Sequence, residues 1–283
     1  MRRLIAILTA LILSAGCSAS EVDTPEPDSA TPSEPGKPSG AADFPAGKTA
    51  DYQLGGPYSP PAGVTIVVRD STATPAAGAY NICYVNAFQT QPGERDLWLR
   101  ERRDLILSGA DGRPLIDQNW PDELLVDTST AQQRDQLAEI VGHTIGDCAA
   151  KGFEAVEFDN LDSYTRSDGK LTAADNLRFA AALTRTAHAA GLLAGQKNAA
   201  DLSEQASGQA SFDFAIAEEC LRFQECTQYR AVYGRRVIDI EYTDDLPGSP
   251  ETVCALPNRP PSTLIRDREL VPEGIAGYFY RHC

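Results

Sequence analysis

Short apolar runs rich in β-branched and aromatic residues alternate with segments of helical periodicity from residue 64 onward. Each run predicts a buried strand, and strands that alternate with helices are typical of a parallel sheet. Eight runs qualify as strands: residues 64–69, 80–85, 123–126, 153–158, 192–196, 212–217, 236–240 and 263–266.

Helical periodicity covers residues 94–107, 131–150, 172–190 and 201–208, whereas residues 220–233 read as a loop-rich stretch. In residues 172–190 the aliphatic side chains share one stripe, and Gly191 supplies a helix stop. Eight strands with intervening helices in about 235 residues predict an α/β fold, the (β/α)8 TIM barrel, as one domain over residues 48–283. An open doubly wound sheet is the alternative, but the residues after the first strand, Asp70-Ser71-Thr72, are not its usual glycine-rich turn.

The N-terminus has the parts of an export signal. Arg2 and Arg3 precede an apolar run at residues 4–13, which is too short to span a membrane, and small residues lead to Cys17. We expect residues 1–17 to be a signal peptide that ends like a bacterial lipobox, with a lipid on Cys17 as the membrane anchor. Because Ser14 stands where leucine is usual, a freely secreted protein is the alternative. Either way, the expected location is extracellular.

Residues 18–47 differ in composition from the rest of the chain. They contain six prolines, many serine, alanine and acidic residues, and almost no large apolar side chain. Such a segment buries too little apolar surface to offset the entropy of ordering. We expect a disordered tether that holds the folded domain away from a membrane or cell wall.

Six cysteines remain once Cys17 is set aside. In an exported chain they imply up to three disulfides, but six cysteines allow 15 pairings, so sequence alone does not fix the connectivity. Pairing neighbours along the chain joins Cys220 to Cys226 and Cys254 to Cys283, and it leaves Cys83 for Cys148. Their spacings match no common zinc pattern, so metal binding is the lesser alternative.

Charge and motifs exclude several classes of function. The 283 residues carry a formal charge of −15, so the chain lacks the basic face that nucleic-acid binding needs. Three dispersed histidines offer little for a catalytic zinc site. The glycine motifs of serine hydrolases and nucleotide-binding proteins are absent from the sequence. No organic cofactor and no catalytic metal is expected.

Polar residues follow most of the predicted strands. In a barrel these strand ends converge on one rim, where barrel enzymes build their active sites. A single charged residue after a strand is more often a solvated loop residue, but repetition at six or seven strand ends favours a functional site. The residues concerned are Asp70, Asn86, Asp127, Glu157, Asp159, Asn160, Asp162, Lys197, Asn198, Glu218, Glu219, Glu241 and Tyr242.

The fourth predicted strand contributes two carboxylates. Val156 and Phe158 share one strand face and are expected to meet the helices, so Glu157 and Asp159 point into the barrel. Two inward carboxylates shift each other's pKa unless a cation intervenes, and Lys197 on the next strand is that candidate cation. A calcium loop is the alternative for this acidic cluster, but the spacing does not match an EF-hand.

The sixth predicted strand ends in Glu218 and Glu219. Small Ala215 and Ala217 suggest that the alanine face is interior, which would aim Glu219 inward, although alternation often fails at a strand's last residue and Glu218 stays open. Alternate strands contribute to the same layer of a barrel, so a carboxylate from each of strands four and six would face one bond. Two carboxylates across a glycosidic bond are the working pair of most glycoside hydrolases.

At these positions the sequence resembles glycoside hydrolase family 114, the endo-α-1,4-polygalactosaminidases. The resemblance extends over about residues 52–266, and its matching stretches are residues 152–164, 195–199, 217–220 with Glu225 and Cys226, and 240–242. It implies a single catalytic barrel that cleaves α-1,4-linked galactosamine polymers internally. It also implies that Asp159 and Glu218 are the catalytic pair, because the family keeps the first glutamate of strand six.

By analogy with related α-retaining barrels, Asp159 is the expected nucleophile and Glu218 the expected acid/base. The resemblance implies substrate-binding roles for Asp70, Tyr84, Asn160, Asp162, Tyr164, Lys197, Asn198, Glu219, Glu241 and Tyr242. A cationic galactosamine polymer also suits the negative charge of the chain.

Two other functions stay open at this stage. Residues 83–88 depart from the glycine-containing turn that family members tend to show, so a hydrolase of another α-linked amino sugar or galactoside is one alternative. The second is a carbohydrate-binding surface lipoprotein that keeps the barrel without turnover, although both proposed carboxylates are present.

Overall fold

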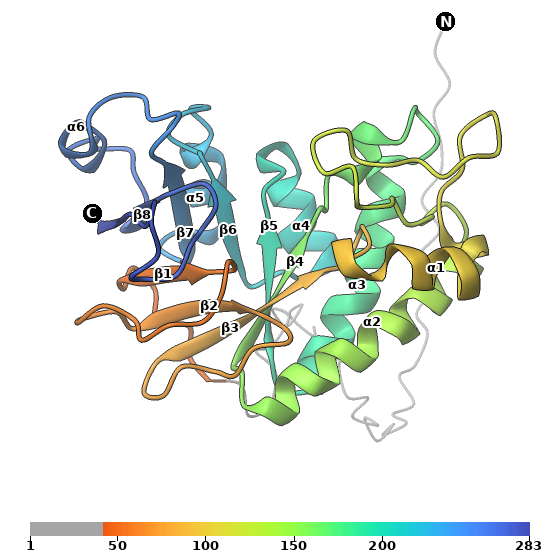
Figure 1. Cartoon of the computed structure of the whole chain (residues 1–283), viewed down its shortest axis with the longest axis horizontal. Coiled ribbons are helices and arrows are strands. Elements are labelled where there is room, and N and C mark those ends of the chain that lie inside the picture. The colour runs from red at the N-terminus through yellow and green to blue at the C-terminus, as the bar shows by residue number, and fades with distance from the viewer. Residues whose placement is uncertain (1–41) are drawn as a thin grey trace, which may run out of the picture. The chain divides into compact units, whose positions relative to one another are not determined.

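Nine strands form one sheet in which each strand pairs with the next along the chain. The computed structural model describes residues 42–283, and Figure 1 shows the strands curving around a common interior. Strands β1 to β8 are parallel to their neighbours, and β9 runs antiparallel to β8. The strands are β1 (Ala50–Gln53), β2 (Ile66–Asp70), β3 (Tyr80–Asn86), β4 (Ala155–Asp159), β5 (Leu193–Lys197), β6 (Phe214–Glu218), β7 (Val237–Tyr242), β8 (Ser262–Arg266) and β9 (Tyr280–His282).

Side chains close the gap between the first and last parallel strands. Arg266 at the end of β8 is fully buried, pairs with Asp51 over 3.1 Å and donates to the carbonyl oxygen of Tyr52 on β1. The hydroxyl of Tyr280 on β9 donates to the carbonyl oxygen of Ala50 over 3.0 Å. The result is a nearly closed barrel, which confirms the predicted fold class.

One strand prediction was wrong, and two strands, β1 and β9, went unrecognised. Residues 123–126 do not join the barrel; they form isolated antiparallel bridges within the long loop of residues 87–130, for example between Ile106 and Val126. The place of that strand is taken by β1, whose residues Asp51 and Gln53 are polar yet buried. Because their polarity hides the hydrophobic pattern, the sequence did not reveal this strand.

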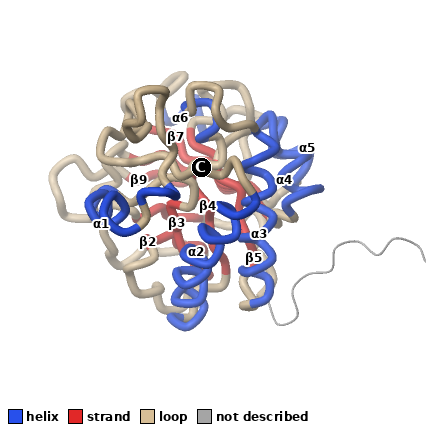
Figure 2. Tube along the Cα trace, turned by 90° about the vertical axis from the view of Figure 1, so that its right-hand side faces the viewer, coloured by secondary structure: helices blue, strands red, loops and turns tan. Residues whose placement is uncertain are grey.

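Helices cover one side of the sheet, as Figure 2 shows for α2 to α5. Thr130 caps α2, and Thr172 with Asp175 forms a reciprocal capping box at α3. Residues 220–233, expected as a loop, form a helix in their second half. The helices are α1 (Arg95–Glu101), α2 (Ala131–Lys151), α3 (Ala173–Ala189), α4 (Ser203–Ala210), α5 (Cys226–Tyr233) and α6 (Pro250–Cys254), with 3-10 turns η1 (Pro92–Glu94), η2 (Arg103–Leu105), η3 (Ser163–Arg166) and η4 (Ala200–Leu202).

The apolar residues divide between the two faces of the sheet. Val156 and Phe158 pack in the outer core with helix residues such as Phe179, as predicted. The inner core contains Phe214 on β6 and Ile66 on β2, among others. Phe44 stacks on Phe214 with ring centroids 4.6 Å apart, so the end of the range expected as a tether contacts the barrel interior.

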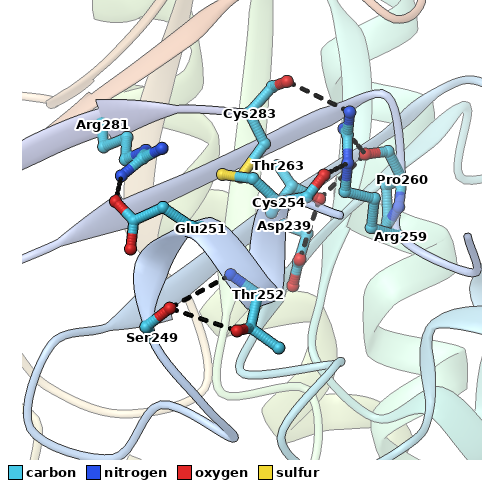
Figure 3. Close-up of a disulfide and its surroundings, with 10 residues drawn as sticks. All are labelled: Asp239, Ser249, Glu251, Thr252, Cys254, Arg259, Pro260, Thr263, Arg281 and Cys283. Carbon is cyan, nitrogen blue, oxygen red and sulfur yellow. Dashed lines mark hydrogen bonds and ion pairs between the residues drawn. A yellow bond between two sulfur atoms is a disulfide. The ribbon is translucent and has the colours of Figure 1, made fainter. Parts of the chain in front are cut away.

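All three predicted disulfides are present. They join Cys83 to Cys148, Cys220 to Cys226, and Cys254 to Cys283. Figure 3 shows the last of these, where Arg259 also donates to the carbonyl oxygen of Cys283. Three disulfides are typical of proteins that fold in an oxidising, exported environment.

The expected signal peptide, its lipidation residue Cys17 and most of the expected tether lie outside the described residues 42–283. Within the described part, no helix has both the length and the apolar character needed to cross a membrane.

Candidate active site

The carboxyl ends of six strands bring one cation, three carboxylates and three tyrosines together. Lys197 ends β5 and is only 2% exposed. Its Nζ lies 3.2 Å from Glu157 Oε1, 3.6 Å from Asp159 Oδ1 and 3.3 Å from Glu218 Oε2. Burial alone would lower the pKa of Lys197, but the surrounding negative charges hold it well above its ordinary value. The lysine is therefore a buried cation shared by the three carboxylates.

Asp159 ends β4 and is held by two further donors. The Tyr84 hydroxyl donates to Asp159 Oδ2 over 2.7 Å, and the backbone N–H of Asn160 donates to Oδ1 over 2.8 Å. Asn160 adopts a φ of 67°, in the left-handed region that asparagine tolerates better than most residues. The Asp159 side chain keeps 17% exposure, so the carboxylate is oriented and still open to a ligand.

Glu218 ends β6 and receives a comparable set of donors. Asn198 Nδ2 donates to Oε2 over 3.2 Å, the Tyr242 hydroxyl donates to Oε1, and the Glu218 N–H donates to Asn198 Oδ1 over 2.8 Å. Burial acts to raise the pKa of Glu218, but Lys197 and these hydrogen bonds outweigh it and lower the pKa overall. The free protein therefore holds Glu218 ionised at neutral pH.

The two carboxylates lie close enough to act on one bond. Since Lys197 Nζ is 3.6 Å from an Asp159 oxygen and 3.3 Å from a Glu218 oxygen, those two oxygens are at most about 7 Å apart. Retaining glycosidases place their carboxyl groups roughly 5–5.5 Å apart and inverting enzymes roughly 6.5–9.5 Å apart. A separation of at most about 7 Å is compatible with both classes, because it covers the whole retaining range and the shortest separations of the inverting range.

Glu157 lies beneath this pair and is fully buried. The Tyr52 hydroxyl donates to its Oε1 over 2.8 Å, and Lys197 Nζ donates to the Tyr52 oxygen over 3.0 Å. Burial raises the pKa of Glu157 to about 7 despite the charge of Lys197. Glu157 was expected to point inward, but no role in binding was predicted for it. Tyr52 gave no sequence signal because β1 was not recognised.

On β6 the structure overturns the prediction that Ala215 and Ala217 face the interior. Both alanines pack against the helices, whereas Phe214 and Ile216 face the barrel interior, so strict alternation carries Glu218 inward. The interior accepts Phe214 because Gly195 stands beside it on β5; a Cβ on that glycine would lie 2.4 Å from the phenylalanine ring. The small size of the alanines on β6 gave the wrong inward face, because Gly195 on the neighbouring strand leaves the space that Phe214 occupies.

Glu219 turns away from the pair with a φ of 60°. Its carboxylate accepts from Arg268 at 2.8 and 3.4 Å, and the guanidinium of Arg268 lies 4.5 Å from the centre of the Tyr242 ring. Arg268, which the sequence did not single out, therefore links Glu219 to the tyrosine that binds Glu218.

Two predicted binding residues do not join the cluster. Glu241 lies on the face of β7 opposite Tyr242, fully buried, and its Oε1 accepts from the N–H of Leu221 over 2.8 Å. Asp70 binds its own turn, accepting from the N–H and the hydroxyl of Thr72 over 2.8 and 2.6 Å.

The loop after β4 holds three more of the predicted residues, and Arg166 binds two of them. This arginine donates to Asn160 Oδ1 over 3.0 Å and to Asp162 Oδ1 over 3.1 Å. Tyr164 is partly buried against a small apolar cluster that contains Leu125. Asn160 is thus adjacent to Asp159, whereas Asp162 and Tyr164 lie further along this loop.

One group of potential metal ligands occurs in the described chain: Cys220, Cys226 and Asp239. Both sulfur atoms belong to a disulfide, so they are not available as thiolates, which are the form that binds metal.

A barrel that presents paired carboxylates at the carboxyl ends of its strands defines the class of protein as a glycoside hydrolase. The family model for glycoside-hydrolase family GH114 matches residues 30–283, and the chain belongs to that family. A comparison with curated protein sequences found no match.

Solved structures share the fold. Ega3 of Aspergillus fumigatus, crystallised with galactosamine, is 24% identical; the match covers 86% of this chain and 98% of that one, with a TM-score of 0.66. The glycoside hydrolase domain of PelA from Pseudomonas aeruginosa is 15% identical, with coverage of 81% and 98% and a TM-score of 0.55. A variant of that domain gives a TM-score of 0.57 at 13% identity.

Proposed function

We propose that the chain is an exported glycoside hydrolase that cleaves α-1,4-linked galactosamine polymers internally, with Asp159 and Glu218 as its catalytic pair. The observation that carries the proposal is the position of these carboxylates on either side of Lys197, both partly exposed at the carboxyl edge of the barrel. The galactosamine bound to Ega3 and the negative charge of this chain support a cationic amino-sugar polymer as substrate.

In the proposed mechanism Asp159 attacks the anomeric carbon while Glu218 gives a proton to the departing oxygen, which leaves a glycosyl-aspartate. Glu218 then takes a proton from water, the water oxygen bonds to the anomeric carbon, and Asp159 leaves. Tyr84 and the N–H of Asn160 hold Asp159 in place for the attack. Because Glu218 is ionised in the free protein, it takes up a proton from solvent water as the substrate binds and displaces the Tyr242 hydroxyl from it.

Export is part of the same proposal. The signal-like residues 1–17 and the three disulfides support an extracellular protein, with a lipid on Cys17 as its anchor. Labelling with radioactive palmitate would mark the wild type and spare Cys17→Ser; an unlabelled wild type would leave the freely secreted form.

The test of function is reducing-end release from α-1,4-polygalactosamine by the purified chain. Asp159→Asn and Glu218→Gln should each lower kcat/KM by about 10³-fold or more, a few kcal/mol of transition-state stabilisation. Asp135→Asn, an equal charge change at an exposed position of α2, is the control and should leave the rate unchanged. Wild-type protein that binds the polymer without cleaving it would contradict the proposal and favour a binding protein.

A substrate with a good leaving group distinguishes the role of Asp159 as nucleophile from the role of Glu218 as acid/base. With an aryl galactosaminide that departs without protonation, Glu218→Gln should recover much of its activity, whereas Asp159→Asn should not. Proton NMR of the first product should show the α anomer; a β product would contradict retention. A panel of α-linked amino-sugar and galactoside polymers tests the substrate itself.

A further inference from the structure

Glu123 lies in the loop of residues 87–130, and hydrogen bonds connect its carboxyl group to Asp159. Asn86 Nδ2 donates to Glu123 Oε2 over 3.0 Å, and Asn160 Nδ2 donates to Asn86 Oδ1 over 2.9 Å. The N–H of Asn160 in turn donates to Asp159 Oδ1, and Asn86 is the register partner of Asp159. Glu123 therefore stands beside the candidate pair at the same edge of the barrel.

The Glu123 carboxyl group is buried without a matching cation. Its residue is 8% exposed, and Arg166, the cation whose charge reaches it, pairs instead with Asp117 over 2.8 Å and with Asp162. Burial raises the pKa of Glu123 to about 7, and the negative charge of Asp159 adds to that rise. A buried acidic group of this kind beside a reactive centre is typical of a site where the ligand supplies the charge.

An independent observation comes from Gln89 on the same loop. This residue is 2% exposed, and its Nε2 donates to Asp117 Oδ2 over 3.0 Å. Its Oε1 is buried and has no hydrogen-bond partner among residues 42–283. The N–H of Asp117 donates to the carbonyl oxygen of Glu123, so the free acceptor and the uncompensated carboxyl group belong to one folded unit.

We propose that Glu123 and Gln89 form a subsite for the protonated amino group of a galactosamine unit next to the bond that is cleaved. An ammonium group carries a positive charge and three donors, which are what the carboxyl group and the amide oxygen lack. N-acetylation removes the charge and adds bulk, so the subsite selects deacetylated units. This inference rests on the proposed function and specifies its substrate selectivity.

The experiment measures kcat/KM on matched α-1,4-linked galactosamine and N-acetylgalactosamine oligosaccharides. Glu123→Gln should lower the ratio of the two values by about ten-fold or more, the size of one hydrogen bond to a charged group, while turnover of the acetylated substrate persists. Gln89→Met should lower the ratio in the same direction. Asp122→Asn, an equal charge change at the exposed neighbouring residue, should leave the ratio unchanged.

Three results would overturn the subsite: an unchanged ratio in Glu123→Gln, an equal loss on both substrates, or the same drop in Asp122→Asn. If the wild type cleaves neither substrate, the proposed function is wrong. The subsite is then tested by measuring sugar binding instead of turnover. Calorimetric titration of the wild type with galactosamine and with galactose should then still show tighter binding of the amine, and Glu123→Gln should abolish that difference. Equal binding of the two sugars would reject the subsite.

Discussion

Lys197 carries much of the electrostatic balance of the site. Its ammonium group lies within 3.6 Å of three carboxylates from β4 and β6, and almost none of it is exposed. Removing one partner of a buried ionic cluster leaves the others without compensation, which costs far more than the loss of an exposed ion pair. The pKa values of the remaining carboxyl groups would then rise, since burial would no longer be opposed by a positive charge.

Lys197→Met should therefore destabilise the fold in a pH-dependent way. We expect the free energy of unfolding to fall by about 3–5 kcal/mol at pH 8 and by less at pH 5, where Glu157 and its neighbours are more readily protonated. Denaturant unfolding at the two pH values measures the effect, with the exposed Lys170→Met as control. An equal loss at both pH values would mean that the lysine acts through packing rather than charge.

At the scale of elements, the loop after β6 is fastened to β7 by three successive N–H groups. Glu219 donates to the carbonyl oxygen of Ile240 over 2.7 Å, Cys220 to Asp239 Oδ1 over 3.2 Å, and Leu221 to Glu241 Oε1 over 2.8 Å. Asp239 also accepts from Thr263 on β8 (Figure 3). Because this loop begins directly after Glu218, its hydrogen bonds to β7 help to fix the position of the Glu218 carboxylate.

Asp239 and Glu241 are both buried, and burial raises the pKa of Glu241 to about 7 and that of Asp239 well above its ordinary value. We expect the pair to share a proton at neutral pH, because burial raises both pKa values. Glu241→Gln mimics the protonated group and should leave stability at pH 6 nearly unchanged. Glu241→Ala leaves the Leu221 N–H without its acceptor and should cost about 1–3 kcal/mol. Thermal unfolding of both variants measures these losses of stability. An equal loss in Glu241→Gln and Glu241→Ala would argue against the shared proton.

At the scale of the whole molecule, several buried acids give stability a common pH dependence. Burial raises the pKa values of Glu123, Glu157 and Glu241 to about 7, whereas an unfolded glutamate titrates near 4.3. Between these values the folded state binds more protons than the unfolded state, so the free energy of unfolding falls as pH rises. Glu218 has the opposite shift, but its contribution changes only below its ordinary pKa.

The melting temperature should therefore be several degrees higher at pH 5 than at pH 8. Calorimetry in about 0.5 M salt measures this difference. Salt screens the repulsion due to the net charge of −15, so the change in melting temperature that remains reports the buried carboxyl groups. Glu123→Gln combined with Glu241→Gln should reduce the difference. A melting temperature that rises from pH 5 to pH 8 would contradict the raised pKa values.

The sequence by itself determined the elements whose signals are local. Seven of the eight predicted strands lie in the barrel, since alternating β-rich runs and helical stretches are written in consecutive residues. Polar strand ends gave Asp159, Lys197 and Glu218 as candidates for one rim, because parallel strands must end together. Pairing nearby cysteines succeeded because neighbouring elements of a barrel are also neighbours in sequence.

Only the tertiary structure decided which side chains meet. The inward direction of Glu218 depends on the space that Gly195 leaves for Phe214 on another strand. The outward direction of Glu241 depends on the amide of Leu221, and the importance of β1 depends on Arg266 from the far end of the chain. The place of Glu123 beside Asp159 depends on a loop that pairs with itself instead of joining the barrel. These features arise from contacts between distant residues, which no local pattern records.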